Sequence, residues 1–379
     1  MDIGKLANGS PQKSRYTSVI KNLGLVLIVS LACVRCSHKA GGITITDEPH
    51  KLLSEYGFFD GVLADLNPGE GVLPYDLNTP LFSDYSQKAR FVWMPDGTSA
   101  SYTEDHVLDF PIGAVLIKNF FYNHDDRDPS LGRKIIETRL LVNRGEEWDA
   151  YGYIWDADQK DANYTIVGDI KDISWVDIDG KDRQVNYIIP NKNQCKSCHA
   201  YKEKLKPIGP KARNLNKSFA YHDLSANQLD RWQEVGYLSG DLPDHKPAVA
   251  KWDNQEEDLH KRAMAYLDIN CGHCHNPNGA GHTSGLTLLA ESEPGLKLGI
   301  YKPSVAAGAG TGGFTYGVVP GDAASSIMVY RMSTDNPGAM MPEVGRQLVH
   351  VEGVALISEW IDQLPANDFD HLLYGDESD

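Results

Sequence analysis

The stretch that decides the fold is Ala114-Val-Leu-Ile-Lys-Asn-Phe-Phe-Tyr122, which two further runs follow, Lys134–Val142 and Trp148–Trp155. β-Branched and aromatic residues dominate all three runs, and each run has the length of a strand. An Asp179-Gly180 turn follows between two more such runs and predicts a hairpin. Because no helical pattern separates these strands, the sequence predicts an antiparallel β sandwich or barrel.

Helical patterns replace the strand patterns after Pro190. The predicted helices are 226–235 with Ser225 as its N-cap, 254–269, 323–332 and 352–364, and a short one precedes the strands at 49–58. The chain is therefore expected to be an α+β multidomain protein, an antiparallel β domain followed by α-helical domains. Its predicted parts are 1–32 as a signal peptide, 33–88 as a linker with a short helix, 89–190 as the β domain, 191–253 and 254–365 as two helical segments, and 366–379 as an acidic tail.

The N-terminus has the pattern of an export signal. A positively charged region ends in the apolar run Leu23–Ala32, which is too short to span a bilayer. Cys33 follows, so the segment resembles a bacterial lipoprotein signal, which implies lipidation of Cys33; an ordinary secretory signal cut near residue 32 is the alternative. We expect a periplasmic protein on a lipid anchor, or otherwise a soluble one. The residue after Cys33 is Val34, not the aspartate that retains bacterial lipoproteins in the inner membrane, so the outer membrane is favoured.

The charge balance excludes one class of partner. The chain of 379 residues has 36 Lys+Arg against 52 Asp+Glu, a formal net charge of −16. A chain this acidic does not follow a phosphate backbone, so nucleic acid is excluded as a partner. Its surface would instead steer basic proteins toward it.

Four of the six cysteines stand in two copies of one motif, Cys195-Lys-Ser-Cys198-His199 and Cys271-Gly-His-Cys274-His275. C-x-x-C-H is the c-type haem attachment pattern, in which two thiols form thioethers with one porphyrin and the histidine binds its iron. Paired C-x-x-C zinc sites usually have about 15–20 residues between the pairs, whereas residues 199–270 separate these pairs. The sequence therefore predicts two covalently bound haem c groups, with His199 and His275 as axial ligands.

More recognisable elements surround the second motif than the first. A predicted helix, the motif, a loop with Met340-Met341-Pro342 and a closing helix resemble a class I cytochrome c domain over residues 254–365. The resemblance implies Met341 as the distal ligand of His275, with the adjacent Met340 as the weaker candidate. For the first haem, the distal candidates stay open: Met264, His222, His245 and His260.

The whole chain, over about residues 50–365, resembles a group of bacterial dihaem c-type cytochromes with a β-rich N-terminal region. The residues that carry this likeness include Leu81–Tyr85, Phe110–Lys118, Thr138–Leu140, Ile189–Cys195 and Met341–Arg346. The resemblance implies one-electron transfer between periplasmic or membrane-associated redox partners, one of them a basic protein. The alternative is a haem enzyme, peroxidase-like or another oxidoreductase, whose open first haem is fed by the second. A third interpretation gives the β domain the task of binding a substrate or partner.

Overall fold

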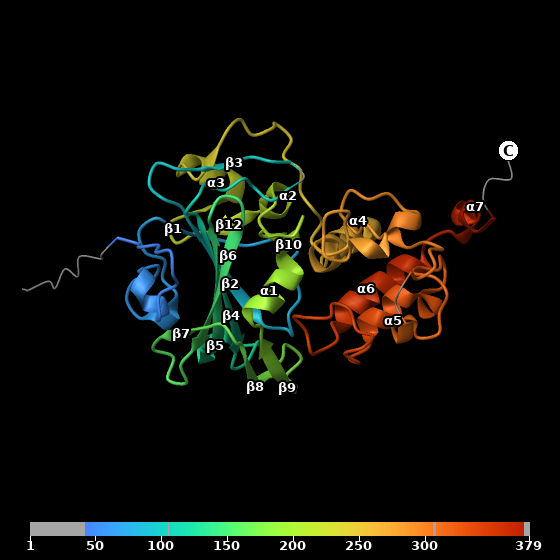
Figure 1. Cartoon of the computed structure of the whole chain (residues 1–379), viewed down its shortest axis with the longest axis horizontal. Coiled ribbons are helices and arrows are strands. Elements are labelled where there is room, and N and C mark those ends of the chain that lie inside the picture. The colour runs from blue at the N-terminus through green and yellow to red at the C-terminus, as the bar shows by residue number, and fades with distance from the viewer. Residues whose placement is uncertain (1–41, 105, 306–307, 375–379) are drawn as a thin grey trace, which may run out of the picture. The chain divides into compact units, whose positions relative to one another are not determined.

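The computed structural model describes residues 42–104, 106–305 and 308–374 (Figure 1). The predicted signal peptide and the predicted lipidation site Cys33 lie outside these residues. Within the described ranges, no helix is long and apolar enough to cross a membrane.

The predicted antiparallel β region is confirmed, and it forms an open sheet. Six strands lie in the order β1-β2-β4-β5-β6-β7, so β1 and β7 are the edges and the sheet does not close on itself. Its strands are β1 (Val72–Tyr75), β2 (Gln87–Trp93), β4 (Val115–Asn123), β5 (Arg133–Asn143), β6 (Trp148–Trp155) and β7 (Ala162–Thr165). The predicted hairpin is present as β8 (Asp169–Val176) and β9 (Asp182–Ile189), a separate two-stranded sheet.

Each face of the six-stranded sheet has its own apolar core, because alternate residues of a strand point to opposite faces. On one face, Ile117 and Leu140 pack with residues of the segment before β1, among them Tyr56. On the opposite face, Leu116 packs with residues that follow the first motif, among them Trp232. Phe120, on that same face, packs with the β8–β9 hairpin.

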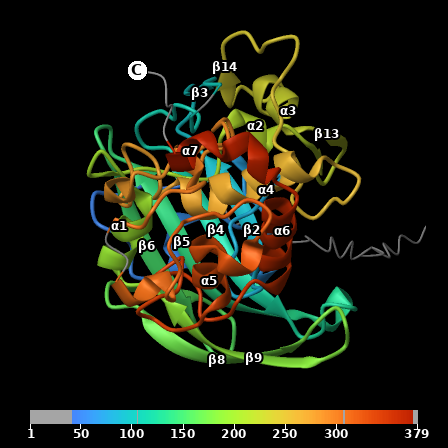
Figure 2. The ribbon, with the colours of Figure 1, turned by 90° about the vertical axis from the view of Figure 1, so that its right-hand side faces the viewer.

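Helices follow the sheet in the chain (Figure 2). They are α1 (Lys192–His199), α2 (Ala212–Leu215), α3 (Gln228–Glu234), α4 (Leu259–Leu267), α5 (Ile327–Ser333), α6 (Val351–Asp362) and α7 (His371–Tyr374). Short strands lie between or beside them: β3 (Ala100–Ser101), β10 (Ala200–Tyr201), β11 (Lys204–Leu205), β12 (Ser218–Ala220), β13 (Ser225–Asn227) and β14 (Leu238–Ser239). A third core unites α4, α5 and α6 through Leu267, Met332 and Ile357.

Three sequence predictions differ from the structure in detail. Ser225 lies in β13, and the N-cap of α3 is Asn227, whose side-chain oxygen accepts a hydrogen bond from the amide of Leu229 at 3.0 Å. The predicted helix over 49–58 is only a 3₁₀ turn at Leu53–Tyr56, which Gly57 ends in a left-handed conformation. The predicted helix over 323–332 is a 3₁₀ turn followed by α5.

Residue 190 does not separate two cores. Leu205, Leu215 and Trp232 from the segment after it are buried in the same cluster as Val92 and Trp148 of the sheet. The first motif therefore belongs structurally to the β region, and the described residues form one compact unit.

Candidate cofactor sites

The first motif lies on α1, which directly follows β9 and contacts β6 (Figure 1). Asn191 caps this helix: its side-chain oxygen accepts a hydrogen bond from the amide of Gln194 at 2.9 Å, and the Gln194 side chain accepts one from the Asn191 amide at 3.0 Å. Cys195 and Cys198 are three residues apart on the helix, a spacing that places them on one face. Both thiols are free and partly buried, and Cys195 packs against the apolar core of the sheet.

His199 is the last residue of α1, and its hydrogen bond fixes the tautomer of its ring. Its Nδ1 lies 2.8 Å from the carbonyl oxygen of Lys206, and a carbonyl only accepts, so Nδ1 carries the proton. Burial lowers the pKa of His199 to about 3, so the ring is neutral at pH 7. Nε2 therefore keeps its lone pair, the form in which an imidazole binds a metal.

The helix α4 continues into a wider helical turn, Asp268–Gly272, and the second motif begins in this turn at Cys271. His275 repeats the arrangement of His199. The Ser284 hydroxyl donates to the carbonyl of Gly281 at 2.7 Å, so its oxygen accepts from Nδ1 of His275 at 2.9 Å. Burial lowers the pKa of His275 as well, and its Nε2 also keeps the lone pair.

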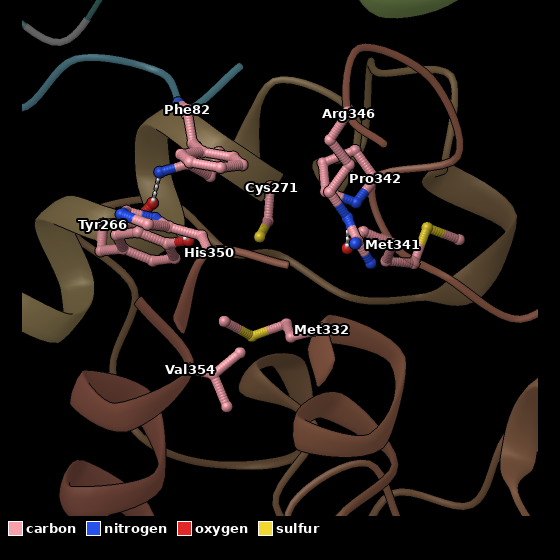
Figure 3. A pocket seen from close by; sticks show the side chains of 10 residues that line it. Phe82, Tyr266, Cys271, Met332, Met341, Pro342, Arg346, His350 and Val354 are labelled. Carbon is pink, nitrogen blue, oxygen red and sulfur yellow. Dashed lines mark hydrogen bonds between the residues drawn. The ribbon is translucent and has the colours of Figure 1, made fainter. Parts of the chain in front are cut away.

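A small, partly open pocket lies beside Cys271 (Figure 3). Met341 and Pro342 line it together with Met332 of α5, and Figure 3 shows Met341 across the pocket from Tyr266 and His350. The full lining comprises Phe82, Tyr266, Asn270, Cys271, Met332, Met341, Pro342, Arg346, His350 and Val354. The adjacent Met340 is buried outside this lining.

The loop that carries Met341 is fixed by Arg346, an arginine that the sequence alone would place at the surface by default. Arg346 is only 3% exposed. Its Nε donates to the carbonyl of Met341 at 3.0 Å, and its Nη2 donates to the carbonyls of Arg331 and Thr334 at 3.1 and 2.9 Å. One guanidinium thus holds the Met341 loop to the C-terminal end of α5.

His350 forms the opposite wall of the pocket. Its ring stacks on Phe82 with centroids 4.1 Å apart, and its Nδ1 is hydrogen-bonded to the Tyr266 hydroxyl at 2.9 Å. Burial lowers the pKa of His350 to about 4, so this wall is uncharged at neutral pH. Sequence reasoning missed His350, because it lies outside every motif.

The two motif segments touch one another. The Cys274 thiol faces the carbonyl of Ser197 at 3.9 Å, and Tyr201 and Gly279 form a β-bridge. The Lys202 amide donates to the carbonyl of Asn278 at 2.8 Å. Groups held at the two motifs would therefore be neighbours.

Gly279 packs closely against the second motif, because a Cβ at this position would collide with the carbonyl of Cys274. We expect Gly279→Ala to destabilise the folded chain by about 1–3 kcal/mol, the usual cost of overpacking. Urea unfolding followed by circular dichroism measures this change. Gly295→Ala is the control, because a Cβ there meets no atom within 4 Å; equal stability of the two variants would contradict the prediction.

The other distal candidates lie apart in the fold. Met264 is 2% exposed in the core of α4, α5 and α6, and His260 accepts a hydrogen bond from Trp360 at 3.0 Å. His222 and His245 are exposed. A further histidine, His273, lies near His199, and burial lowers the pKa of both rings.

No family model, curated protein or solved structure matches this chain. In the part of the chain that the structure describes, no group of three or more His, Cys, Asp or Glu side chains is arranged to hold a metal ion.

Proposed function

We propose that the protein is an exported dihaem c-type cytochrome that transfers single electrons between periplasmic or membrane-associated partners. Cys195 and Cys198 would hold one haem c, and Cys271 and Cys274 the other. His199 and His275 would be the proximal ligands. The class of protein is the β-rich dihaem cytochrome group that the sequence resembles, with a class I-like second haem site.

The observation that carries this proposal is the shared state of the two motif histidines. Each Nδ1–H donates to a fixed acceptor, Lys206 O or Ser284 Oγ, and each Nε2 keeps its lone pair. When the ring nitrogen that does not bind the metal donates such a hydrogen bond, the bond orients the imidazole and raises its basicity. A histidine that served only packing would not need the same tautomer twice, each time directly after a C-x-x-C pair.

The side chains around the small pocket beside Cys271 support a haem at the second motif, although His275 is not one of them. The pocket lining is mainly apolar and includes Met341, which stands on a loop that Arg346 holds in place. Haem, when bound, supplies an iron that cycles between Fe(III) and Fe(II), and a Met/His ligand pair raises its potential. The chain's own part is to hold the ligands, exclude water and set the two potentials.

The contact between the motif segments supports transfer through the protein. Because Cys274 lies against Ser197, the two cofactor sites adjoin within one compact unit. The net charge of −16 favours a basic donor or acceptor. We further propose that Cys33 anchors the mature chain to a membrane by a lipid, with the outer membrane preferred.

The proposal predicts the mass and colour of the protein exported from a host that assembles c-type haem. The purified chain should carry the mass of two haems, and it should show reversible haem absorption. The paired variants Cys195→Ala/Cys198→Ala and Cys271→Ala/Cys274→Ala should each lose one haem, whereas the control Ser197→Ala should keep both. A colourless chain with the mass of bare polypeptide, or one that holds zinc, would overturn the proposal.

The spin state of the first iron separates the carrier from the enzyme. An electron carrier should show two low-spin, six-coordinate haems in its EPR spectrum. A high-spin, five-coordinate first haem would instead favour the peroxidase-like alternative.

A further inference from the structure

Four cations lie on the sheet face that carries α1. Arg90 of β2, Lys118 of β4 and Arg139 of β5 are direct cross-strand neighbours, and Lys88 lies two residues before Arg90 on the same face. We call these four residues the cation row. Along β4, Lys118 stands between Leu116 and Phe120, which belong to two separate apolar clusters. The row therefore lies between two apolar clusters of the same face.

The row has more basic side chains than the protein's carboxylates pair. Burial, and after it the charge of Arg90, lowers the pKa of Lys88 to about 7 and the pKa of Lys118 well below its usual value. Arg90 is paired with Asp76 at 2.8 Å, and Arg139 with Glu137 at 2.5 Å. Lys88 and Lys118 have no carboxylate within 4 Å among the described residues; Lys88 donates to the carbonyl of Ser86 at 2.6 Å. The Lys118 ammonium lies over the ring of Phe120, 4.7 Å from its centroid. Two partly buried lysines thus lack an anion in a chain that is acidic overall.

A second sign of a missing anion is the guanidinium of Arg90. The residue is 5% exposed, and its Nη2 is buried with no hydrogen-bond partner in the described part of the chain. A buried polar group without a partner costs free energy, and more so when it is charged. Beside Lys88 and Arg90, a cleft of about 480 Å³ opens to solvent.

The row lies next to the first motif. Cys195 packs against the apolar cluster that contains Leu116, two residues before Lys118 on β4. The helix α1 also contacts β6, the strand that pairs with Arg139 on β5. From Arg139 the row extends over two strand spacings to Arg90, about 10 Å across the sheet. In haem, the thioether edge and the edge with two propionate carboxylates lie on opposite sides of the ring, so a haem attached at Cys195 and Cys198 has its two anions some distance from the thiols.

We propose that the cation row binds the propionates of the haem attached at Cys195 and Cys198, so that the β-sheet forms the floor of the first haem site. The inference rests on the proposed function and adds a role for the β region, with Lys88 and Lys118 supplying the two unpaired positive charges. Carboxylates are the favoured partners of such buried cations, because charge-assisted hydrogen bonds are about twice as strong as neutral ones.

The test is a redox titration of the holoprotein with Lys118→Gln. Removing a positive charge beside a haem disfavours the reduced iron. We therefore expect the ratio of reduced to oxidised haem at a fixed electrode potential to fall about tenfold for one haem, a shift of about 59 mV for one electron, and to stay unchanged for the other. Lys88→Gln should act in the same direction. Lys118→Arg, which keeps the charge, should restore most of the wild-type value.

Lys134→Gln is the matched control, because Lys134 is exposed on β5 of the same sheet and should leave both potentials unchanged. If both haems are attached but Lys118→Gln and Lys88→Gln leave both potentials at the wild-type value, the inference fails and the proposed function stands. If mass spectrometry finds no haem at either motif, both fail. Inorganic phosphate at constant ionic strength tests for a free-anion site: a potential that shifts in the wild type but not in Lys118→Gln would show that the row binds a soluble anion and overturn the inference.

Discussion

Met341→Ala should convert the second haem from a low-spin to a high-spin or solvent-ligated form and lower its midpoint potential by an amount on the order of 0.1 V. The physical reason is that a thioether stabilises Fe(II), and axial ligands set haem potentials over a range of about 0.8 V. The visible spectrum and a redox titration of the purified holoprotein measure both effects. The first haem should keep its spectrum, because His199 belongs to the other motif.

Met340→Ala is the matched control for this ligand assignment. Met340 is 5% exposed and does not line the pocket, so its removal should cost stability and leave the spectrum of the second haem intact. Met332 of α5 also lines the pocket, so it is the alternative ligand that the experiment must exclude. If Met332→Ala changes the spectrum and Met341→Ala does not, the ligand is Met332.

Asp268→Ala should lower the free energy of unfolding by about 3–5 kcal/mol, the usual cost of removing one partner of a buried ion pair. Asp268 is 3% exposed in the turn before Cys271. It accepts hydrogen bonds from Lys211 at 2.8 Å and Arg213 at 3.1 Å, which come from the segment that packs on the sheet. The substitution would leave two cations without this carboxylate at the junction of the first and second motif segments.

Asp253→Ala is the control for the buried pair, because its partner Lys251 lies at 3.5 Å and both side chains are largely exposed. An exposed pair contributes about 0–1 kcal/mol. Urea unfolding of both variants, followed by far-ultraviolet circular dichroism, compares them directly. A change below about 1 kcal/mol for Asp268→Ala would show that the junction does not depend on this carboxylate.

The strands could be predicted from the sequence because their signal is local. The predicted strand Trp148–Trp155 has the bounds of β6, and the hairpin around Asp179-Gly180 is present. Alternation and a turn dipeptide depend only on neighbouring residues. Whether a sheet closes on itself depends on contacts between distant residues. The sequence therefore predicted a sandwich or a barrel, whereas the structure has an open sheet with a hairpin and short helices on one face.

The two motifs could be found from spacing alone, but their surroundings could not. Lys118 and Arg139 lie in segments already noted for their family likeness, yet nothing in the sequence indicates that they are cross-strand neighbours beside His199. In the sequence alone, Arg346 is an ordinary charged residue. Only the folded loop shows that its guanidinium donates hydrogen bonds to four backbone carbonyls. These roles arise from contacts between residues far apart in the chain.

Contacts between residues far apart in the chain also affect the order in which parts of the protein fold. The Asp84 carboxylate accepts hydrogen bonds from the amides of Gln347 and Leu348, and the Phe82 amide donates to Asn270. A chain synthesised from its N-terminus cannot make the first two of these contacts until its last tenth emerges, and proteins rich in such distant pairings fold slowly. The loop at residues 82–86 is therefore expected to close late, and Phe82 would complete the lining of the pocket beside Cys271 only at that stage.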